Sequence, residues 1–372
     1  MSKHTALYGT HEALGASFTD FGGWQMPLKY SSELAEHHAV RQSAGLFDLS
    51  HMGEVWVTGP EAGAFLDYAL VGKLSAVADG KAKYSLICNA DGGIIDDLLA
   101  YRFGPEKYLV VPNAGNAPTV AAELAKRAEG FDVVVENVSD AMSLIAVQGP
   151  NAEAILLKLT DDAQHELVTG LKYYAFNEAT VAGHDVILAR TGYTGEDGFE
   201  LFLPNEGAAT LWASISEAGA GLGLIPCGLA CRDSLRLEAG MPLYGNELSL
   251  EGNPFAAGLG PVVALSKEGN FVGKEALAAL KAGGAGTTSG RRLVGLKGLG
   301  RRAARGHYPV LKDGAVIGEV TSGQPSPTLG YPVAMAYVDV EHSEIGTAVE
   351  ADLRGKAEPF EVIALPFYKR AK

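Results

Sequence analysis

Alternating apolar and polar positions divide most of the chain into short strands and amphipathic helices. Helices are predicted over 31–43, 117–129 and 228–239. Ser32 suits the N-cap of the first helix, Glu33 suits its first turn, and Gly240 ends the last helix. Strands are predicted over 54–58, 131–136, 142–147, 184–190 and 198–203. This mixture indicates an α+β fold.

One strand-to-helix unit occurs twice, at 57–62 (VTGPEA) and at 147–152 (VQGPNA). In each copy an apolar strand runs into Gly-Pro, and a helix follows. Pro60 suits the first helical position, because the N–H that proline lacks would have no partner there. The two copies predict a pseudo-repeated α+β core.

The pattern changes near the C-terminal quarter of the chain. Residues 282–290 (AGGAGTTSG) predict a linker. Short strands separated by Gly and Pro turns follow, at 315–320, 333–338 and 360–364. They predict a small closed or sandwich-like β domain.

Length, net charge and the N-terminal residues limit the classes of partner and the cellular compartment that we expect for this protein. The 372 residues are enough for two or three domains, and a net charge of −14 argues against nucleic acid or an anionic membrane as main partner. No apolar run approaches the roughly 20 residues of a membrane span. Residues 1–4 show neither a secretory segment nor an Arg-rich transit peptide, so we expect a cytoplasmic protein.

Three cysteines are too few for a disulfide framework and indicate a reducing compartment. They are Cys88, Cys227 and Cys231. Cys227 and Cys231 can share a helix face, but no neighbouring His or Cys completes a zinc set. We expect buried free thiols.

An acidic pair stands inside the apolar, strand-like run 92–99 (GGIIDDLL). Buried ionised carboxylates are unfavourable unless something pairs with them or uses them. Side chains alternate along a strand, so Asp96 and Asp97 face opposite ways, and one can face the interior or a cleft. The alternative is a turn at 91–93 followed by an edge strand with solvated acids, and the segment alone favours that alternative.

Common catalytic motifs are missing from the chain: no Gly-x-Gly-x-x-Gly follows a first strand, and neither a phosphate loop nor a Gly-x-Ser-x-Gly elbow occurs. His37 and His38 are adjacent and cannot share a helix face, which argues against a helical metal pair. His51 alone predicts a structural, hydrogen-bonding histidine.

Three other segments combine unusual residue types, at 192–200, 227–238 and 321–329. Tyr193, Glu200 and Arg232 together suit a flat, nitrogen-rich heterocycle. The aromatic ring stacks on it, the acid accepts from its N–H groups, and the arginine holds a carboxylate. The alternative is a set of surface turns and a salt-bridged helix, with Arg232 and Arg236 one turn apart.

Taken jointly, seven segments resemble the aminomethyltransferase, or T-protein, family of the glycine cleavage system. They are 20–27 (DFGGWQMP), 44–53 (AGLFDLSHMG), 92–97 (GGIIDD), 146–152 (AVQGPNA), 190–200 (RTGYTGEDGFE), 232–241 (RDSLRLEAGM) and 321–329 (TSGQPSPTL). The resemblance implies a three-domain cloverleaf. Its parts are a discontinuous ferredoxin-like folate-binding domain over 1–52 and 138–281, a related inserted α+β domain over 53–137, the linker 282–290, and a C-terminal β-barrel over 291–372.

The resemblance also implies the reaction. An aminomethyl group arrives on the lipoyl arm of the H-protein, and the cosubstrate tetrahydrofolate takes the one-carbon unit. The products are 5,10-methylenetetrahydrofolate, ammonia and the dihydrolipoyl protein. No metal or redox cofactor is implied. The reaction belongs to glycine catabolism and one-carbon metabolism.

Site roles follow from the same resemblance. Asp96 matches the acid that lies beside folate N10, which can orient N10 and stabilise positive charge on the transferred carbon. Tyr193 and Glu200 match the pterin contacts, and Arg232 matches the arginine of the folate site. The complete set of implied folate-binding residues is Met52, Tyr84, Tyr101, Asn113, Tyr193, Glu200, Arg232 and Tyr368.

The chain departs from the family pattern at three places. Cys231 replaces a small residue, Pro261 stands where tryptophan is usual, and Asn253 replaces a common threonine. The departures concern the lining near residues 253–262 and leave the remaining matches unchanged.

Two rival functions belong to the same fold. One is another tetrahydrofolate-dependent transferase, such as a demethylase with a free methylated donor, because entrance loops decide the donor. The other is a non-catalytic folate-binding protein, whose relatives generally lack the Asp-Asp segment and carry a Lys-Gly-Cys-Tyr motif. This chain has the acidic pair and lacks that motif.

One basic segment stands out in this acidic chain. Residues 291–305 carry six basic residues and no acid. Such a patch steers an acidic partner, and both an acidic H-protein and the polyglutamate tail of folate fit that description. The alternative is a solvated strand and loop.

Overall fold

The computed structural model describes residues 2–283 and 290–371. Their contacts divide them into two compact units. The first unit comprises residues 2–66, 74–84 and 98–233, and the second comprises 67–73, 85–97, 234–283 and 290–371. No described helix is long and apolar enough to cross a bilayer.

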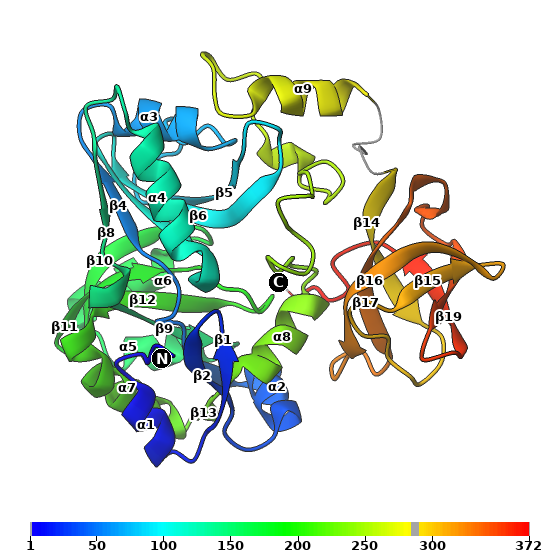
Figure 1. Cartoon of the computed structure of the whole chain (residues 1–372). Helices are drawn as coiled ribbons and strands as arrows, with labels where there is room; N and C mark the ends of the chain where they lie inside the picture. The colour runs from blue at the N-terminus through cyan, green and yellow to red at the C-terminus, as the bar shows by residue number, and fades with distance from the viewer. Residues whose placement is uncertain (1, 284–289, 372) are drawn as a thin grey trace. The chain divides into compact units, whose positions relative to one another are not determined.

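The first unit contains a six-stranded sheet (Figure 1). Its order is β10 (Phe176–Val181), β11 (His184–Ala189), β12 (Gly198–Pro204), β9 (Met142–Gln148), β3 (Ala44–Asp48) and β13 (Leu224–Pro226). Only β13 and β3 pair in parallel within this sheet. Side chains of α5 (Ala152–Leu157), α6 (His165–Gly170) and α7 (Asn205–Ala220) share a buried core with these strands.

The N-terminal segment of the same unit forms α1 (Tyr8–Ala13), a hairpin of β1 (Ser17–Phe21) and β2 (Trp24–Lys29), and α2 (Glu33–Gln42). The predicted helix 31–43 is confirmed as α2. Ser32 is its N-cap, since the Ser32 hydroxyl accepts a hydrogen bond from the Ala35 N–H at 3.5 Å.

A five-stranded sheet runs β5 (Lys81–Cys88), β6 (Ile94–Gly104), β7 (Lys107–Pro112), β4 (Val55–Thr58), β8 (Val134–Asn137). Two of the boundaries between the units fall within β5 and β6. Helix α3 (Ala62–Ala69) follows β4, and α4 (Ala117–Arg127) confirms the helix predicted over 117–129. Strand β8 begins at Val134, three residues later than predicted.

The predicted strand-to-helix unit occurs in both places in the structure. Gly59 after β4 and Gly149 after β9 have φ angles of 131° and 133°, a conformation that side chains rarely adopt. The Ala62 N–H donates to the Gly59 carbonyl at 3.1 Å, and the Ala152 N–H donates to the Gly149 carbonyl at 3.0 Å. Each helix begins two residues after its proline, so Pro60 lies in the turn and not at the predicted first helical position.

The second unit contains a closed six-stranded barrel (Figure 1). Its order is β14 (Arg291–Gly298), β17 (Pro332–Asp339), β16 (Ala315–Pro325), β15 (Pro309–Lys312), β18 (Ala348–Asp352) and β19 (Ala357–Ile363). Closure gives every strand two neighbours and removes sheet edges. The predicted small β domain is therefore a barrel.

Helix α9 (Lys274–Ala282) precedes the barrel and includes the first residue of the predicted linker. Residues 284–289 of that linker lie outside the described residues. The helix predicted over 228–239 is α8 (Leu229–Glu238), and Gly240 follows it with a φ of 66°. The predicted domain boundaries stay a prediction.

Candidate functional site

The loop between β11 and β12 carries Tyr193, and the side chain of Gln148 at the end of β9 forms hydrogen bonds with this loop. The Gln148 side-chain amide donates to the Thr191 carbonyl at 3.1 Å and accepts from the Thr194 hydroxyl at 2.9 Å. Gly192 and Gly198 pack directly on this amide, and a Cβ on either would lie within 2.5 Å of it. The two glycines are needed for this close approach.

Two arginine side chains also hold this loop in place. Arg41 of α2 donates to the Thr194 carbonyl at 2.7 Å and pairs with Glu196 at 3.0 Å, and both side chains of this pair are buried. Arg190 pairs with Asp197 inside the loop. These contacts hold the backbone on both sides of Tyr193, and a loop that is ordered in advance loses less entropy when a ligand binds.

Glu200 on β12 is the buried acid next to this loop. The Thr191 hydroxyl donates a short hydrogen bond to Glu200 Oε2. The Tyr101 hydroxyl lies 3.5 Å from the same oxygen and 3.3 Å from the Thr191 hydroxyl. Tyr101 comes from β6, and its ring packs edge-on against Phe176 and Phe202.

Arg232 of α8 completes the cluster. Its guanidinium carbon lies 4.8 Å from the centre of the Tyr193 ring, within the range of a cation–π contact. Burial lowers the pKa of Arg232, while Tyr193 and Glu200 raise it. Burial raises the pKa of Glu200, and the Thr191 hydrogen bond and the charge of Arg232 oppose that rise. The positive group thus favours the carboxylate form of Glu200.

Four predicted site residues are therefore brought together in the first unit: Tyr101, Tyr193, Glu200 and Arg232. An aromatic face, a buried hydrogen-bond acceptor and a fixed cation suit a flat ligand that carries N–H donors and a negative group. The alternative of unconnected surface turns is wrong for this part of the chain.

Three further predicted residues, Met52, Tyr84 and Asn113, are half-buried in the same unit. Met52 belongs to a turn after β3, which the Met52 N–H closes by donating to the Leu49 carbonyl at 2.9 Å. Asn113 directly follows β7. These three residues have the partial exposure that a binding wall requires, and their roles stay predictions.

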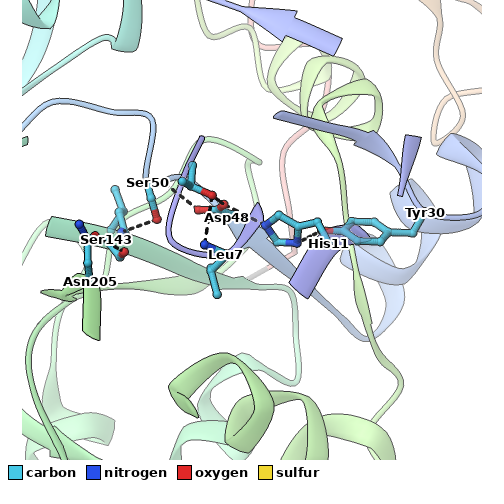
Figure 2. A network of polar contacts seen from close by, with 9 residues as sticks. Leu7, His11, Tyr30, Asp48, Ser50, Ser143 and Asn205 are labelled. Atoms are coloured by element: carbon cyan, nitrogen blue, oxygen red, sulfur yellow. Dashed lines mark hydrogen bonds and ion pairs between the residues drawn. The ribbon is translucent and has the colours of Figure 1, made fainter. Parts of the chain in front are cut away.

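A buried polar network anchors the turn that carries Met52 (Figure 2). The Asp48 carboxylate accepts from the Thr5 hydroxyl at 2.7 Å and from the Ser50 N–H at 2.9 Å, and it lies 2.9 Å from His11 Nε2. Burial alone would raise the pKa of Asp48, but these hydrogen bonds hold it below its usual value. Asp48 thus remains ionised in the interior.

The far side of His11 contacts the Tyr30 hydroxyl at 2.8 Å, and the Ser50 hydroxyl accepts from the Leu144 N–H at 3.1 Å (Figure 2). The network therefore ties the N-terminal segment, β3 and β9 together. Sequence reasoning missed it because its members are far apart in the chain.

His51 in the same turn is buried and meets the Phe21 ring edge-on. Burial and then the charge of Arg232 lower the pKa of His51 to about 4, so the ring is neutral. Within the described residues, the buried Nδ1 atom has no hydrogen-bond partner. The predicted hydrogen-bonding role is therefore wrong at this nitrogen.

Asp96 and Tyr368 lie in the second unit. Asp96 on β6 is 0% exposed, whereas Asp97 is half-buried, so the predicted alternation is confirmed and the alternative of two solvated acids is wrong. The Ile94 N–H donates to the Ser249 carbonyl at 3.2 Å, and the Tyr244 hydroxyl donates to the Ile94 carbonyl at 3.2 Å. Tyr368 is half-buried, and its N–H donates to the Glu238 carbonyl at 2.8 Å.

The cysteines are free and buried, as predicted. Glu36 joins Cys227 and Cys231 in a buried group whose possible ligand atoms lie within 4.8 Å of one another. The Glu36 carboxylate already accepts from three backbone N–H groups, those of Tyr30, Ser31 and Gly228. These contacts explain the burial of Glu36 as the anchor that holds the start of α8.

The departures from the family pattern differ in their effect. Asn253 is buried, and its side-chain oxygen accepts from the N–H groups of Phe255 and Ala256 at 3.1 and 3.0 Å. It therefore closes a turn, a role that threonine can also fill. Pro261 is exposed, in the short 3-10 turn Gly260–Val262.

Comparison with known proteins gives one consistent family. The GCVT N-terminal domain matches residues 7–267, and the glycine cleavage T-protein C-terminal barrel domain matches residues 291–369. An aminomethyltransferase of Streptomyces avermitilis is 59% identical over 371 residues, which cover 100% of this chain and 98% of that protein. An aminomethyltransferase of Streptomyces coelicolor is 58% identical, with the same coverage.

A solved structure agrees with this result. The crystal structure of glycine cleavage system aminomethyltransferase T from Bartonella henselae has a TM-score of 0.91 and 38% identity, and the match covers 99% of both chains. The similarity thus extends over both compact units.

Proposed function

Because this chain belongs to the aminomethyltransferase (T-protein) family of the glycine cleavage system, we propose that it transfers a one-carbon unit to tetrahydrofolate. The donor is the aminomethyl group on the dihydrolipoyl arm of the H-protein. The products are 5,10-methylenetetrahydrofolate, ammonia and the dihydrolipoyl H-protein.

The cluster of Glu200, Tyr193 and Arg232 is the observation that carries the folate assignment. A pterin ring presents adjacent N–H donors, which a buried carboxylate accepts, and a flat face, which a tyrosine ring covers. Arg232 lies over Tyr193 and can hold a negative group of the ligand. Met52, Tyr84, Asn113 and Tyr368 are proposed as further folate contacts, and the fully buried Tyr101 is proposed to contribute through Glu200.

Glu200→Gln is expected to weaken tetrahydrofolate binding by roughly 1–3 kcal/mol. The substitution keeps the size of the side chain but replaces one acceptor by an NH₂ donor, which then faces the donors of the pterin. Isothermal titration calorimetry of tetrahydrofolate measures the effect. Unchanged affinity would remove Glu200 from the proposed site. Glu178→Gln is a matched control, because Glu178 is exposed on β10 of the same sheet.

Asp96 is proposed to act in the chemical step. Its carboxylate orients N10 of the folate and stabilises positive charge that develops on the transferred carbon. Attack by one folate nitrogen on this carbon breaks its bond to the amino group, which leaves as ammonia with the proton of that nitrogen. Attack by the second folate nitrogen then breaks the carbon–sulfur bond, and the sulfur leaves as the dihydrolipoyl thiol with the second proton. The carbon then bridges N5 and N10 as the methylene group. No resident metal or redox cofactor takes part in the proposal.

One assay separates this function from its rivals. Formation of 5,10-methylenetetrahydrofolate is measured with aminomethylated H-protein, with free aminomethyl-lipoamide and with methylated sulfonium or amine donors. We expect product with the first two donors and none with the methylated donors. Product with a methylated donor alone would indicate a demethylase, and folate binding without product from any donor would indicate a non-catalytic protein.

The basic segment is proposed to dock the H-protein. Arg291 at its start pairs with Asp339 at 3.2 Å and belongs to the barrel wall. Beyond β14 several side chains of the segment lie at the surface: Arg301, Arg302 and Arg305 are exposed, and Leu299 is 56% exposed. Exposed arginines beside an apolar side chain suit an acidic protein surface.

Replacing Arg301, Arg302 and Arg305 with Ser is expected to slow turnover with aminomethylated H-protein and to flatten its dependence on ionic strength. Turnover with free aminomethyl-lipoamide is expected to be largely spared. Steady-state rates over a salt series with both donors test this. Equal losses with both donors would assign the segment to folding or to the folate site.

The reaction is proposed to take place in the cytoplasm. The three buried free thiols fit a reducing compartment, in which such thiols persist.

A further inference from the structure

Within the described part of the chain, the hydrogen bonds that Glu200 receives reach one of its two oxygens: the hydroxyls of Thr191 and Tyr101 both approach Oε2. The carboxylate is buried on β12, between β11 and β9. Oε1 is then the oxygen that can accept from a ligand.

The side chains of Tyr101, Thr191 and Glu200 form a hydrogen-bond relay that ends at the carboxylate. Thr191 gives its only hydroxyl proton to Glu200, so toward Tyr101 its oxygen can only accept; the Tyr101 hydroxyl lies 3.3 Å from this oxygen and 3.5 Å from Glu200 Oε2 and can donate to either. The Tyr101 ring is fixed by Phe176 and Phe202, and the Thr191 carbonyl is fixed by the Gln148 amide. Both ends of the relay are therefore rigid.

We propose that Thr191 is a positioning residue for ligand binding: its hydroxyl, aligned by Tyr101, occupies Glu200 Oε2 and directs Oε1 toward the N–H donors of the bound heterocycle. This inference rests on the proposed function, because the heterocycle is the pterin of tetrahydrofolate. Thr191 itself is 2% exposed and acts through Glu200.

The electrostatics of Glu200 are consistent with this role. Burial raises the pKa of Glu200, and the Thr191 hydrogen bond is the first of the groups that lower it again. Without the hydroxyl, the folded-state pKa rises further. A protonated Glu200 loses an acceptor for the pterin, so binding then weakens at a higher pH than in the wild type.

The experiment uses the full chain and compares Thr191→Val with Thr191→Ser. Valine keeps the shape of threonine and removes the hydroxyl, whereas serine keeps the hydroxyl. Thr191→Val is expected to raise the Kd and KM for tetrahydrofolate on the order of 10-fold, with kcat changed much less. Affinity for tetrahydrofolate falls as the pH is lowered, and Thr191→Val is expected to move this fall, the acidic limb of the affinity profile, to higher pH. Thr191→Ser is expected to keep the wild-type affinity for tetrahydrofolate and its wild-type pH dependence.

Two further variants keep the result decisive. Tyr101→Phe keeps the ring between Phe176 and Phe202 and removes the far hydroxyl, so it gives a smaller change in the same direction and serves if Thr191→Val does not fold. Thr194→Val removes a hydroxyl that contacts Gln148 and not Glu200, so it tests loosening of the loop without a shift of the acidic limb.

The outcomes separate the inference from the proposed function. If Glu200→Gln weakens binding while Thr191→Val and Tyr101→Phe both bind like the wild type, the positioning role is overturned and the folate assignment stands. If Glu200→Gln binds like the wild type, the folate assignment at Glu200 fails, and the positioning role fails with it. An equal shift of the acidic limb in Thr194→Val would also overturn the role.

Discussion

Asp96→Asn is expected to lower turnover on the order of 10²-fold or more while the Kd for tetrahydrofolate changes little. Asparagine matches aspartate in size but carries no negative charge, so it can neither stabilise a cationic carbon nor take a proton. Single-turnover rates with aminomethylated H-protein report the chemical step, and calorimetry of tetrahydrofolate reports binding. Near-native turnover would remove Asp96 from the mechanism.

Asp97→Asn is the matched control for this experiment. The two residues are neighbours on β6 with opposite side-chain directions, and Asp97 is half-buried where Asp96 is fully buried. A general effect of lost negative charge on this strand would lower turnover equally in both variants. A loss confined to Asp96→Asn would instead assign the effect to the buried carboxylate.

Local signals predicted the parts of the fold that depend on few residues. The Gly-Pro turns after β4 and β9 were predictable because Gly59 and Gly149 are needed for the same positive φ, and no distant residue changes that requirement. Helix α7 was missed. Its buried Leu211, Trp212 and Ile215 have helical spacing, but small residues between them weaken the amphipathic pattern.

The candidate site was predictable in its residues and not in its connections. Tyr193, Glu200 and Arg232 stand in distinctive motifs, so chemistry and family resemblance both select them. The relay from Tyr101 to Thr191 joins residues 90 positions apart, and only tertiary packing of β6 against the Tyr193 loop places them together. Gln148 was likewise predicted only as part of a turn, although its amide supports the whole loop.

Glu54 is a residue whose environment could not be predicted, although it stands at the start of the predicted strand 54–58. The structure buries Glu54 completely, and within the described residues neither carboxylate oxygen has a hydrogen-bond partner. Burial raises the pKa of Glu54 well above its usual value, which favours the neutral form. No pattern in the sequence distinguishes such an acid from a solvated one.

The second arginine of the motif in α8 has a structural role that is separate from that of Arg232. Arg236 is buried and pairs with Glu247 at 2.9 Å. Its guanidinium also donates to the Ser322 hydroxyl of β16 at 2.8 Å and to the Met241 carbonyl at 3.2 Å. The predicted alternative of a salt-bridged helix is thus correct for Arg236, whose pair is internal to the second unit.

Arg236→Met is expected to lower the free energy of unfolding by about 3–5 kcal/mol, because it leaves the Glu247 carboxylate buried without its cation. Urea unfolding of the full chain, followed by the near-UV signal of its aromatic side chains, measures the change. Arg291→Met is the control: Arg291 and Asp339 are 40% and 39% exposed, and such a pair contributes about 0–1 kcal/mol.

A double variant identifies the cause of this loss. Arg236→Met combined with Glu247→Met removes both charges and fills the space with apolar side chains, so most of the lost stability is expected to return. If the unpaired charge is the cause, Glu247→Met alone is also strongly destabilising, because it leaves the guanidinium of Arg236 buried without its carboxylate. If the double variant is as unstable as the sum of the two single variants, the loss comes instead from the Ser322 and Met241 contacts of the guanidinium. A loss in Arg236→Met no larger than that of Arg291→Met would contradict the assigned role of the buried pair.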